Sequence, residues 1–166
     1  MRGMGMAWVI GAGLMAGPAA AEEACRLTDA VYGQADGYAL AFAAPGVGAI
    51  AGTSQDFTLS GPRLGAPLTG AVIWNNGLSR PNGFLTHDCP PDADEEELAA
   101  CTLWEGVLYA VSGGGIDLLP EAADAPAPEQ ILLPDLGRTL RYSALPFPEA
   151  LDGPPWDVFT LEACRK

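Results

Sequence analysis

The sequence is poor in the side chains that many enzyme and metal sites need. It holds one histidine, His87, and one lysine, Lys166, and no methionine follows Met15. A single lysine at the chain end leaves little room for Schiff-base chemistry. One histidine without methionine makes a poor copper site. No two cysteines lie two to four residues apart, as structural zinc sites require. We therefore expect no metal and no cofactor.

Basic residues are also scarce. Eight Lys and Arg stand against 21 Asp and Glu, which gives a formal net charge of −13. This charge repels phosphate groups, so nucleic acids and anionic lipid surfaces are disfavoured partners. A glycine-rich phosphate loop is missing too, because the glycines at 113–115 lack its flanking pattern and predict a turn. What remains is an unidentified protein or small-molecule ligand.

Residues 1–21 predict a secretion signal. Arg2 precedes an apolar run from Met6 to Ala16, and Ala19 to Ala21 forms a small-residue cleavage site. The apolar run is shorter than the ~20 residues that span a bilayer, so no stable membrane insertion is expected. Cleavage would leave residues 22–166 as a single mature domain in the periplasm or outside the cell, long enough to bury a core.

Four cysteines, an even number in a chain expected to be exported, indicate two disulfides. Three pairings are possible, and the sequence alone does not choose among them. We favour Cys89–Cys101 as a local bridge and Cys25–Cys164 as a clasp between the two chain ends. The entropy of loop closure puts their contributions to stability at no more than about 3 and 5 kcal/mol.

Short apolar runs punctuated by glycine and proline predict a mainly β fold, a small sandwich or barrel-like domain. In one run Tyr38, Leu40 and Phe42 alternate with alanines, which gives a strand with a core face. One short helix is predicted at about 94–101, where Asp94 and Glu97 have capping-box spacing. Strands are predicted at residues 37–43, 55–60, 71–75, 84–86, 103–111, 130–133, 139–143 and 156–161.

A turn-rich stretch after the predicted strand 71–75 combines an aromatic ring, several amides and a guanidinium. Such a mixture suits a small anion, a sugar or a peptide end, because Arg80 offers planar paired donors. In the competing interpretation Trp74 is a core residue and the amides only shape turns. The candidate binding residues are Trp74, Asn75, Asn76, Ser79, Arg80, Asn82 and His87.

Two catalytic arrangements are also conceivable. His87 could be a general base with Ser79 as nucleophile and Asp88 or another acid as the orienting group. Ser79 lacks the following glycine of a nucleophile elbow, however, and Asp88 would point away from His87 on a strand. Glu105 and Asp157 form the second candidate, because each follows a tryptophan in a predicted strand, where burial suits acid catalysis.

The sequence therefore predicts an exported, disulfide-bonded binding or accessory domain without enzymatic activity. Its candidate surface is the Trp74–His87 stretch, and its ligand is unknown. The alternative is a small exported hydrolase that uses His87 or the Glu105/Asp157 carboxylate pair.

Overall fold

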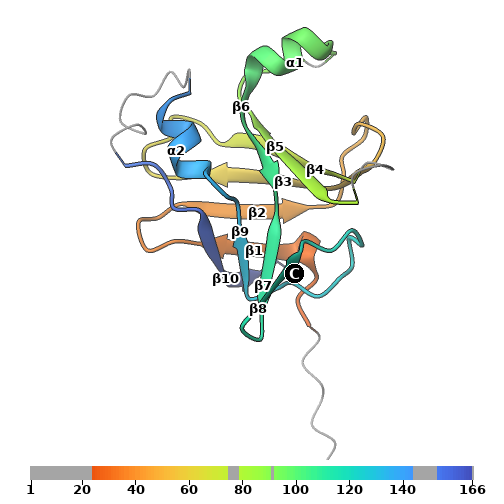
Figure 1. Cartoon of the computed structure of the whole chain (residues 1–166), viewed down its shortest axis with the longest axis vertical. Helices are drawn as coiled ribbons and strands as arrows, with labels where there is room; N and C mark the ends of the chain where they lie inside the picture. The colour runs from red at the N-terminus through yellow and green to blue at the C-terminus, as the bar shows by residue number, and fades with distance from the viewer. Residues whose placement is uncertain (1–23, 75–78, 91, 144–152, 166) are drawn as a thin grey trace, which may run out of the picture.

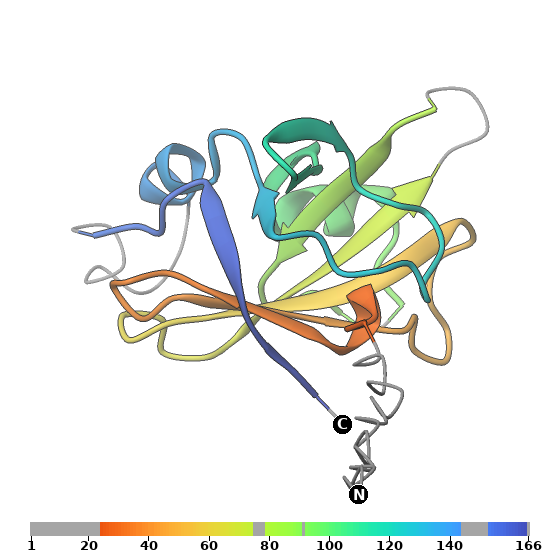
Figure 2. The ribbon, with the colours of Figure 1, turned by 90° about the horizontal axis from the view of Figure 1, so that it is seen from below.

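The computed structural model describes residues 24–74, 79–90, 92–143 and 153–165. An antiparallel sheet curls into a nearly closed barrel (Figures 1 and 2), which confirms the mainly β, barrel-like prediction. The order across the sheet is β6-β5-β4-β3-β2-β1-β10-β9-β7-β8. The strands are β1 (Ala30–Gly33), β2 (Ala39–Ala43), β3 (Thr53–Ser60), β4 (Leu68–Trp74), β5 (Pro81–Thr86), β6 (Thr102–Val107), β7 (Tyr109–Ser112), β8 (Gly115–Leu118), β9 (Gln130–Leu132) and β10 (Val158–Cys164).

Alternating side chains build the core. In β2 the leucine and phenylalanine point inward while the alanines face outward, as the period of two requires. Three inward rings from neighbouring strands meet: Tyr32 contacts Phe42 edge-on at 5.8 Å between centroids, and Phe42 lies 5.6 Å from Phe57. Other fully buried residues are Leu40, Leu59, Leu68, Val72, Leu85, Leu108, Ile131 and Phe159. Large apolar side chains therefore occupy the interior of the barrel.

The predicted strand 103–111 is divided in two. β6 pairs with β5, whereas β7 pairs with β8 and β9 near the other edge of the sheet. The break falls at Leu108, which is buried; its N–H donates to the Pro81 carbonyl oxygen at 3.1 Å, and its own carbonyl accepts from Leu119 at 3.2 Å. A straight strand could not reach both edges, so this bend brings the barrel close to closure.

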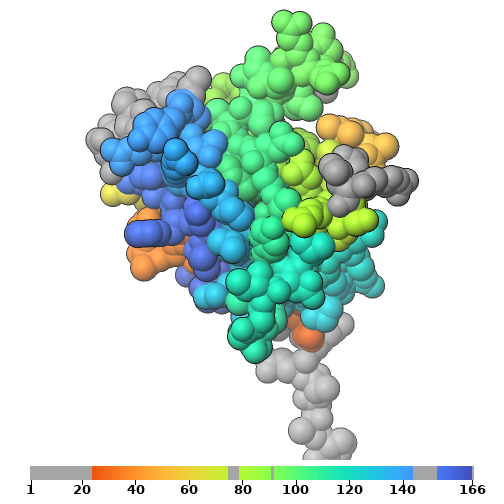
Figure 3. All heavy atoms as spheres, viewed as in Figure 1, coloured from red at the N-terminus to blue at the C-terminus, as the bar shows by residue number. Residues whose placement is uncertain are grey.

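The predicted helix is confirmed as α1 (Glu95–Cys101), and its capping box is complete. The Glu97 N–H donates to the Asp94 side chain at 2.9 Å, and the Asp94 N–H donates to the Glu97 side chain at 3.1 Å. None of the helix residues is buried, and Figure 3 shows α1 projecting from the body of the molecule. No helix in the described ranges is long and apolar enough to cross a membrane.

The strand predicted at 139–143 is wrong, because most of this segment belongs to helix α2 (Leu136–Arg141). Leu136 and Leu140 are one helical turn apart and both are buried, so a helix covers the core here better than a strand would. The predicted strand at 130–133 is confirmed as β9.

Two strands were not predicted from the sequence. β1 follows the short 3₁₀ helix η1 (Leu27–Asp29), and β8 follows the glycine run. The turn predicted at 113–115 is confirmed as the β7–β8 connection. Gly113 and Gly114 have φ of 57° and 79°, values that a tight hairpin needs and that favour glycine.

Both predicted disulfides are confirmed. The Cα atoms of Cys25 and Cys164 lie 5.7 Å apart, and those of Cys89 and Cys101 lie 5.4 Å apart. The second bridge spans the base of α1, and the first joins the two ends of the domain. Two intramolecular disulfides suggest an oxidising extracellular or periplasmic compartment.

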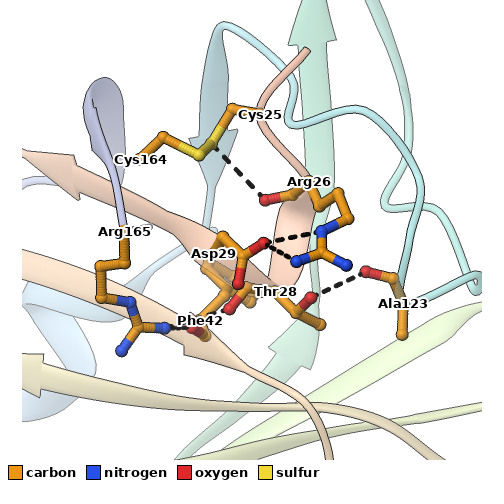
Figure 4. Close-up of a disulfide and its surroundings, with 8 residues drawn as sticks. All are labelled: Cys25, Arg26, Thr28, Asp29, Phe42, Ala123, Cys164 and Arg165. Atoms are coloured by element: carbon orange, nitrogen blue, oxygen red, sulfur yellow. Dashed lines mark hydrogen bonds and ion pairs between the residues drawn. A yellow bond between two sulfur atoms is a disulfide. The ribbon is translucent and has the colours of Figure 1, made fainter. Parts of the chain in front are cut away.

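Hydrogen bonds reinforce the terminal clasp (Figure 4). The Arg165 guanidinium donates to the Thr28 carbonyl oxygen at 3.0 Å and to that of Phe42. The Thr28 hydroxyl donates to the Ala123 carbonyl oxygen at 3.1 Å. The clasp therefore ties η1, β2, the end of β10 and the connection before β9 together.

Candidate functional site

The sequence-predicted binding residues are divided between the two ends of β5. Four lie at the β4–β5 connection: Trp74, Ser79, Arg80 and Asn82. Asn75 and Asn76 lie outside the described residues. His87 follows the far end of β5, five residues after Asn82, which is about 16 Å by the rise of a strand. The structure therefore brings four of these residues into one region and places His87 in another.

At the β4–β5 connection the polar groups differ in their surroundings. Ser79 and Arg80 are exposed, and Trp74 is half-buried. The Trp74 indole nitrogen is buried and has no hydrogen-bond partner among the described residues. The Asn82 amide donates to Glu105 at 2.7 Å. Asn82 is thus engaged with β6.

His87 contacts Asp88, contrary to the expectation that the two would point apart. The His87 Nε2 lies 3.3 Å from the Asp88 Oδ2. Asp88 has φ of 52°, so the chain has already left the strand and the carboxylate turns back toward the ring. Ser79 is separated from this pair by the whole length of β5. Ser79 is therefore not in reach of His87 as a nucleophile.

Glu105 and Asp157 have separate partners. Glu105 is exposed on β6 and accepts from Asn82. Asp157 accepts from the backbone N–H groups of Asp135 at 2.9 Å and Gly137 at 3.3 Å, where it holds the start of α2. No interaction among the described residues joins the two carboxylates.

A groove of about 1000 Å³ lies along β10, beside the β1–β2 connection and the start of α2. The β1–β2 connection, orange, and the blue segment leading into β10 meet there (Figures 1 and 3). Trp156 lines it and is 77% exposed. We call it the Trp156 groove, defined by Gln34, Asp36, Arg138, Trp156, Thr160 and Glu162.

The Gln34 side chain fixes the backbone of Trp156. Its amide nitrogen donates to the carbonyl oxygens of Trp156 at 2.7 Å and Val158 at 2.8 Å. Its amide oxygen accepts from the Trp156 N–H at 3.0 Å. The predicted strand 156–161 accordingly begins later, at Val158, because both backbone groups of Trp156 are bonded to a side chain. The indole is thus exposed on a segment whose backbone is held.

The start of the same segment is held at Gly153. The Tyr38 hydroxyl donates to the Gly153 carbonyl oxygen at 2.8 Å, and the Arg63 guanidinium donates to the same atom at 3.0 Å. Burial raises the pKa of the Tyr38 hydroxyl, so it stays a donor at a pH where an exposed tyrosine begins to ionise. Pro154 and Pro155 add rigidity between this anchor and Trp156.

The walls of the groove carry more negative than positive charge. Among the described residues, Asp36, Asp157 and Glu162 line it together with one basic residue, Arg138 on α2. The Glu162 carboxylate folds back over Gly33, where even a Cβ atom would lie 2.2 Å from it. Glycine at this position therefore lets the carboxylate lie flat against the β1 backbone.

A second groove, of about 500 Å³, lies on the outer face of β2 to β5. Cross-strand pairing sets Ala41, Thr58, Thr69 and Thr86 in one row across four strands. These short side chains make the surface shallow, and the row presents no aromatic ring or charge. Outside this row, Asp56, Phe84 and Arg165 also line the groove, which has about half the volume of the Trp156 groove.

Neither a metal centre nor a known family points to a function. Among the described residues, no group of three or more His, Cys, Asp and Glu side chains could hold a metal ion. The chain matches no protein-family model, no curated protein and no solved structure. Function must therefore be inferred from the site itself.

The Trp156 groove was not predicted from the sequence. Trp156 is separated from Gln34 by 122 residues, so no local pattern connects them. One signal was available: Trp156, Val158, Thr160 and Glu162 share one face of a strand whose other face carries Phe159 and Leu161. Because Phe159 is buried, the first set faces outward.

Proposed function

We propose that the mature chain is an exported, non-catalytic binding or accessory domain that binds its partner through the Trp156 groove. One observation carries this proposal. The Trp156 side chain is exposed, while Gln34 forms two hydrogen bonds with the Trp156 backbone and a third with the Val158 carbonyl oxygen.

Fixing the backbone in advance favours binding. A ligand that contacts a rigid tryptophan pays less conformational entropy than one that must order a loop. Tryptophan is also enriched among the residues that dominate binding energy in interfaces. Export to an oxidising compartment follows from the expected signal at residues 1–21 and agrees with the two disulfides.

The test is capture from a periplasmic extract with oxidised mature protein as bait. Trp156→Ala should abolish capture of the specific partner. Tyr142→Ala is the matched control, because Tyr142 is equally exposed, at 79%, but lines a different groove beside α2. If both variants capture the same molecules as the wild type, the Trp156 groove is not the binding surface.

The hydrolase alternative is supported by one contact, the 3.3 Å approach of His87 to Asp88. A histidine oriented by a carboxylate can act as a general base. This function predicts hydrolysis of an ester, amide or glycoside substrate that is lost in His87→Ala and retained in Trp156→Ala. Partner capture that is lost in Trp156→Ala and retained in His87→Ala would leave the binding proposal in place.

A further inference from the structure

We infer that the Trp156 groove binds a cation, specifically a ligand that carries a substituted ammonium group. The inference rests on the proposed function and adds the chemical class of the ligand. It depends on two features of the groove, its exposed aromatic face and the sign of its charges.

The first feature is the exposed ring face of the Trp156 indole. The indole carries negative charge density on its ring face and attracts a cation placed within about 6 Å of it, more strongly than phenylalanine or tyrosine does. Three hydrogen bonds to Gln34 hold the backbone that presents this face. A substituted ammonium suits such a surface, because its methyl or methylene groups contact the ring while the charge stays near it.

The charged residues that line the groove indicate the sign of the charge on the ligand. Asp36 and Glu162 line the groove, and neither forms an ion pair with a described residue. The third acid, Asp157, has both carboxylate oxygens bonded to backbone N–H groups at the start of α2. Arg138 is the single described basic residue in the lining, and Arg63 donates to the carbonyl oxygen of Gly153, which also lines the groove. A cation in the groove therefore meets the Trp156 indole and two carboxylates that form no ion pair with a described residue.

Other ligand classes fit less well. An anion would approach Arg138 but meet the carboxylates and the excess of 13 negative charges on the chain. A neutral sugar could stack on the indole, but its affinity would not follow the charge of the groove. Cationic, anionic and neutral ligands therefore predict different directions of change in affinity when single charges of the groove are removed.

The probe is choline, titrated into the oxidised mature protein with tryptophan fluorescence and calorimetry as readouts. Its neutral analogue, 3,3-dimethylbutan-1-ol, has the same shape without the charge. We expect choline to bind at least about tenfold more tightly than the alcohol, and Trp156→Leu to weaken choline roughly tenfold. Trp156→Phe should fall between Leu and the wild type.

Variants that each remove one charge from the groove test the sign of the charge on the ligand. Asp36→Asn and Glu162→Gln should each weaken choline binding about threefold or more, and Arg138→Gln should strengthen it. The matched control is Asp124→Asn, which changes the net charge equally at an exposed site outside the groove and should leave affinity unchanged. Raising the salt concentration should weaken binding in every case.

The inference fails if choline does not bind, if the neutral alcohol binds as well, or if Arg138→Gln weakens choline binding. All three outcomes leave the binding function standing if the partner captured from extract is still lost in Trp156→Ala. If that capture persists in Trp156→Ala, the proposed function itself is overturned. Circular dichroism of each variant confirms that the surface substitutions leave the fold intact.

Discussion

Replacing Gln34 with glutamate tests whether this side chain holds Trp156 in place. The change keeps the size of the side chain but turns the amide nitrogen, a double donor, into an oxygen. Two hydrogen bonds to the Trp156 and Val158 carbonyl oxygens are lost, and the carboxylate then faces those oxygens. At about 1 kcal/mol for each bond, the segment is destabilised by about 2 kcal/mol. The bond from the Trp156 N–H can persist.

The assay is fluorine NMR on protein labelled with 5-fluorotryptophan, combined with urea denaturation. Trp104 is buried, and its indole N–H donates to the Pro134 carbonyl oxygen at 3.0 Å. Its signal should therefore stay unchanged in Gln34→Glu, while the Trp156 signal shifts and narrows as the segment gains motion. Ligand affinity should fall although the indole is untouched, because preorganisation is lost.

The matched control is Gln130→Glu on the neighbouring strand β9. It adds the same charge but removes one bond, from the Gln130 amide to the Thr160 hydroxyl at 3.2 Å. It should cost less stability than Gln34→Glu and leave the Trp156 signal in place. An unchanged Trp156 signal and an unchanged urea midpoint in Gln34→Glu would refute the idea that Gln34 fixes this segment.

Three further predictions concern stability. Cys25→Ser with Cys164→Ser should lower the free energy of unfolding in urea by up to about 5 kcal/mol, and an unchanged midpoint would show that the clasp contributes nothing. Gly70→Ala should cost about 1–3 kcal/mol, because the new Cβ would lie 2.3 Å from the Phe57 ring; full stability in thermal unfolding would contradict this close packing. Tyr32→Phe should stabilise the protein by about 1 kcal/mol, because the buried hydroxyl lacks a hydrogen-bond partner among the described residues. Burial raises the pKa of Tyr32, so the wild type should lose stability as pH rises above about 10, where the unfolded chain ionises first, and this loss should be smaller in Tyr32→Phe.

Local patterns predicted much of the fold. Alternation in β2 and β3 follows from the two-residue period of a strand, and the Asp94–Glu97 capping box follows from the spacing of one helical turn. The disulfide pairing also agreed with the simplest arrangement of a local bridge and a terminal clasp. Each of these features depends on neighbours in sequence or on the oxidation of an even set of cysteines.

Other features depend on distant parts of the chain. Leu108 looks like the middle of one strand, and only the Pro81 and Leu119 backbone groups that bond to it divide that strand. The segment 139–143 has the composition of a strand, yet Asp157 binds the backbone N–H groups at the start of α2. In both cases a tertiary hydrogen bond outweighs a weak local preference.

The sequence by itself determined a mainly β chain with two disulfides, because side-chain alternation, turn residues and cysteine number act locally. Only the tertiary structure placed an exposed tryptophan in a groove. Two hydrogen bonds hold the Trp156 backbone, and both join it to Gln34, 122 residues away in the β1–β2 connection. The pairing of β1 with β10 brings residues so far apart together, and no spacing along the chain encodes it.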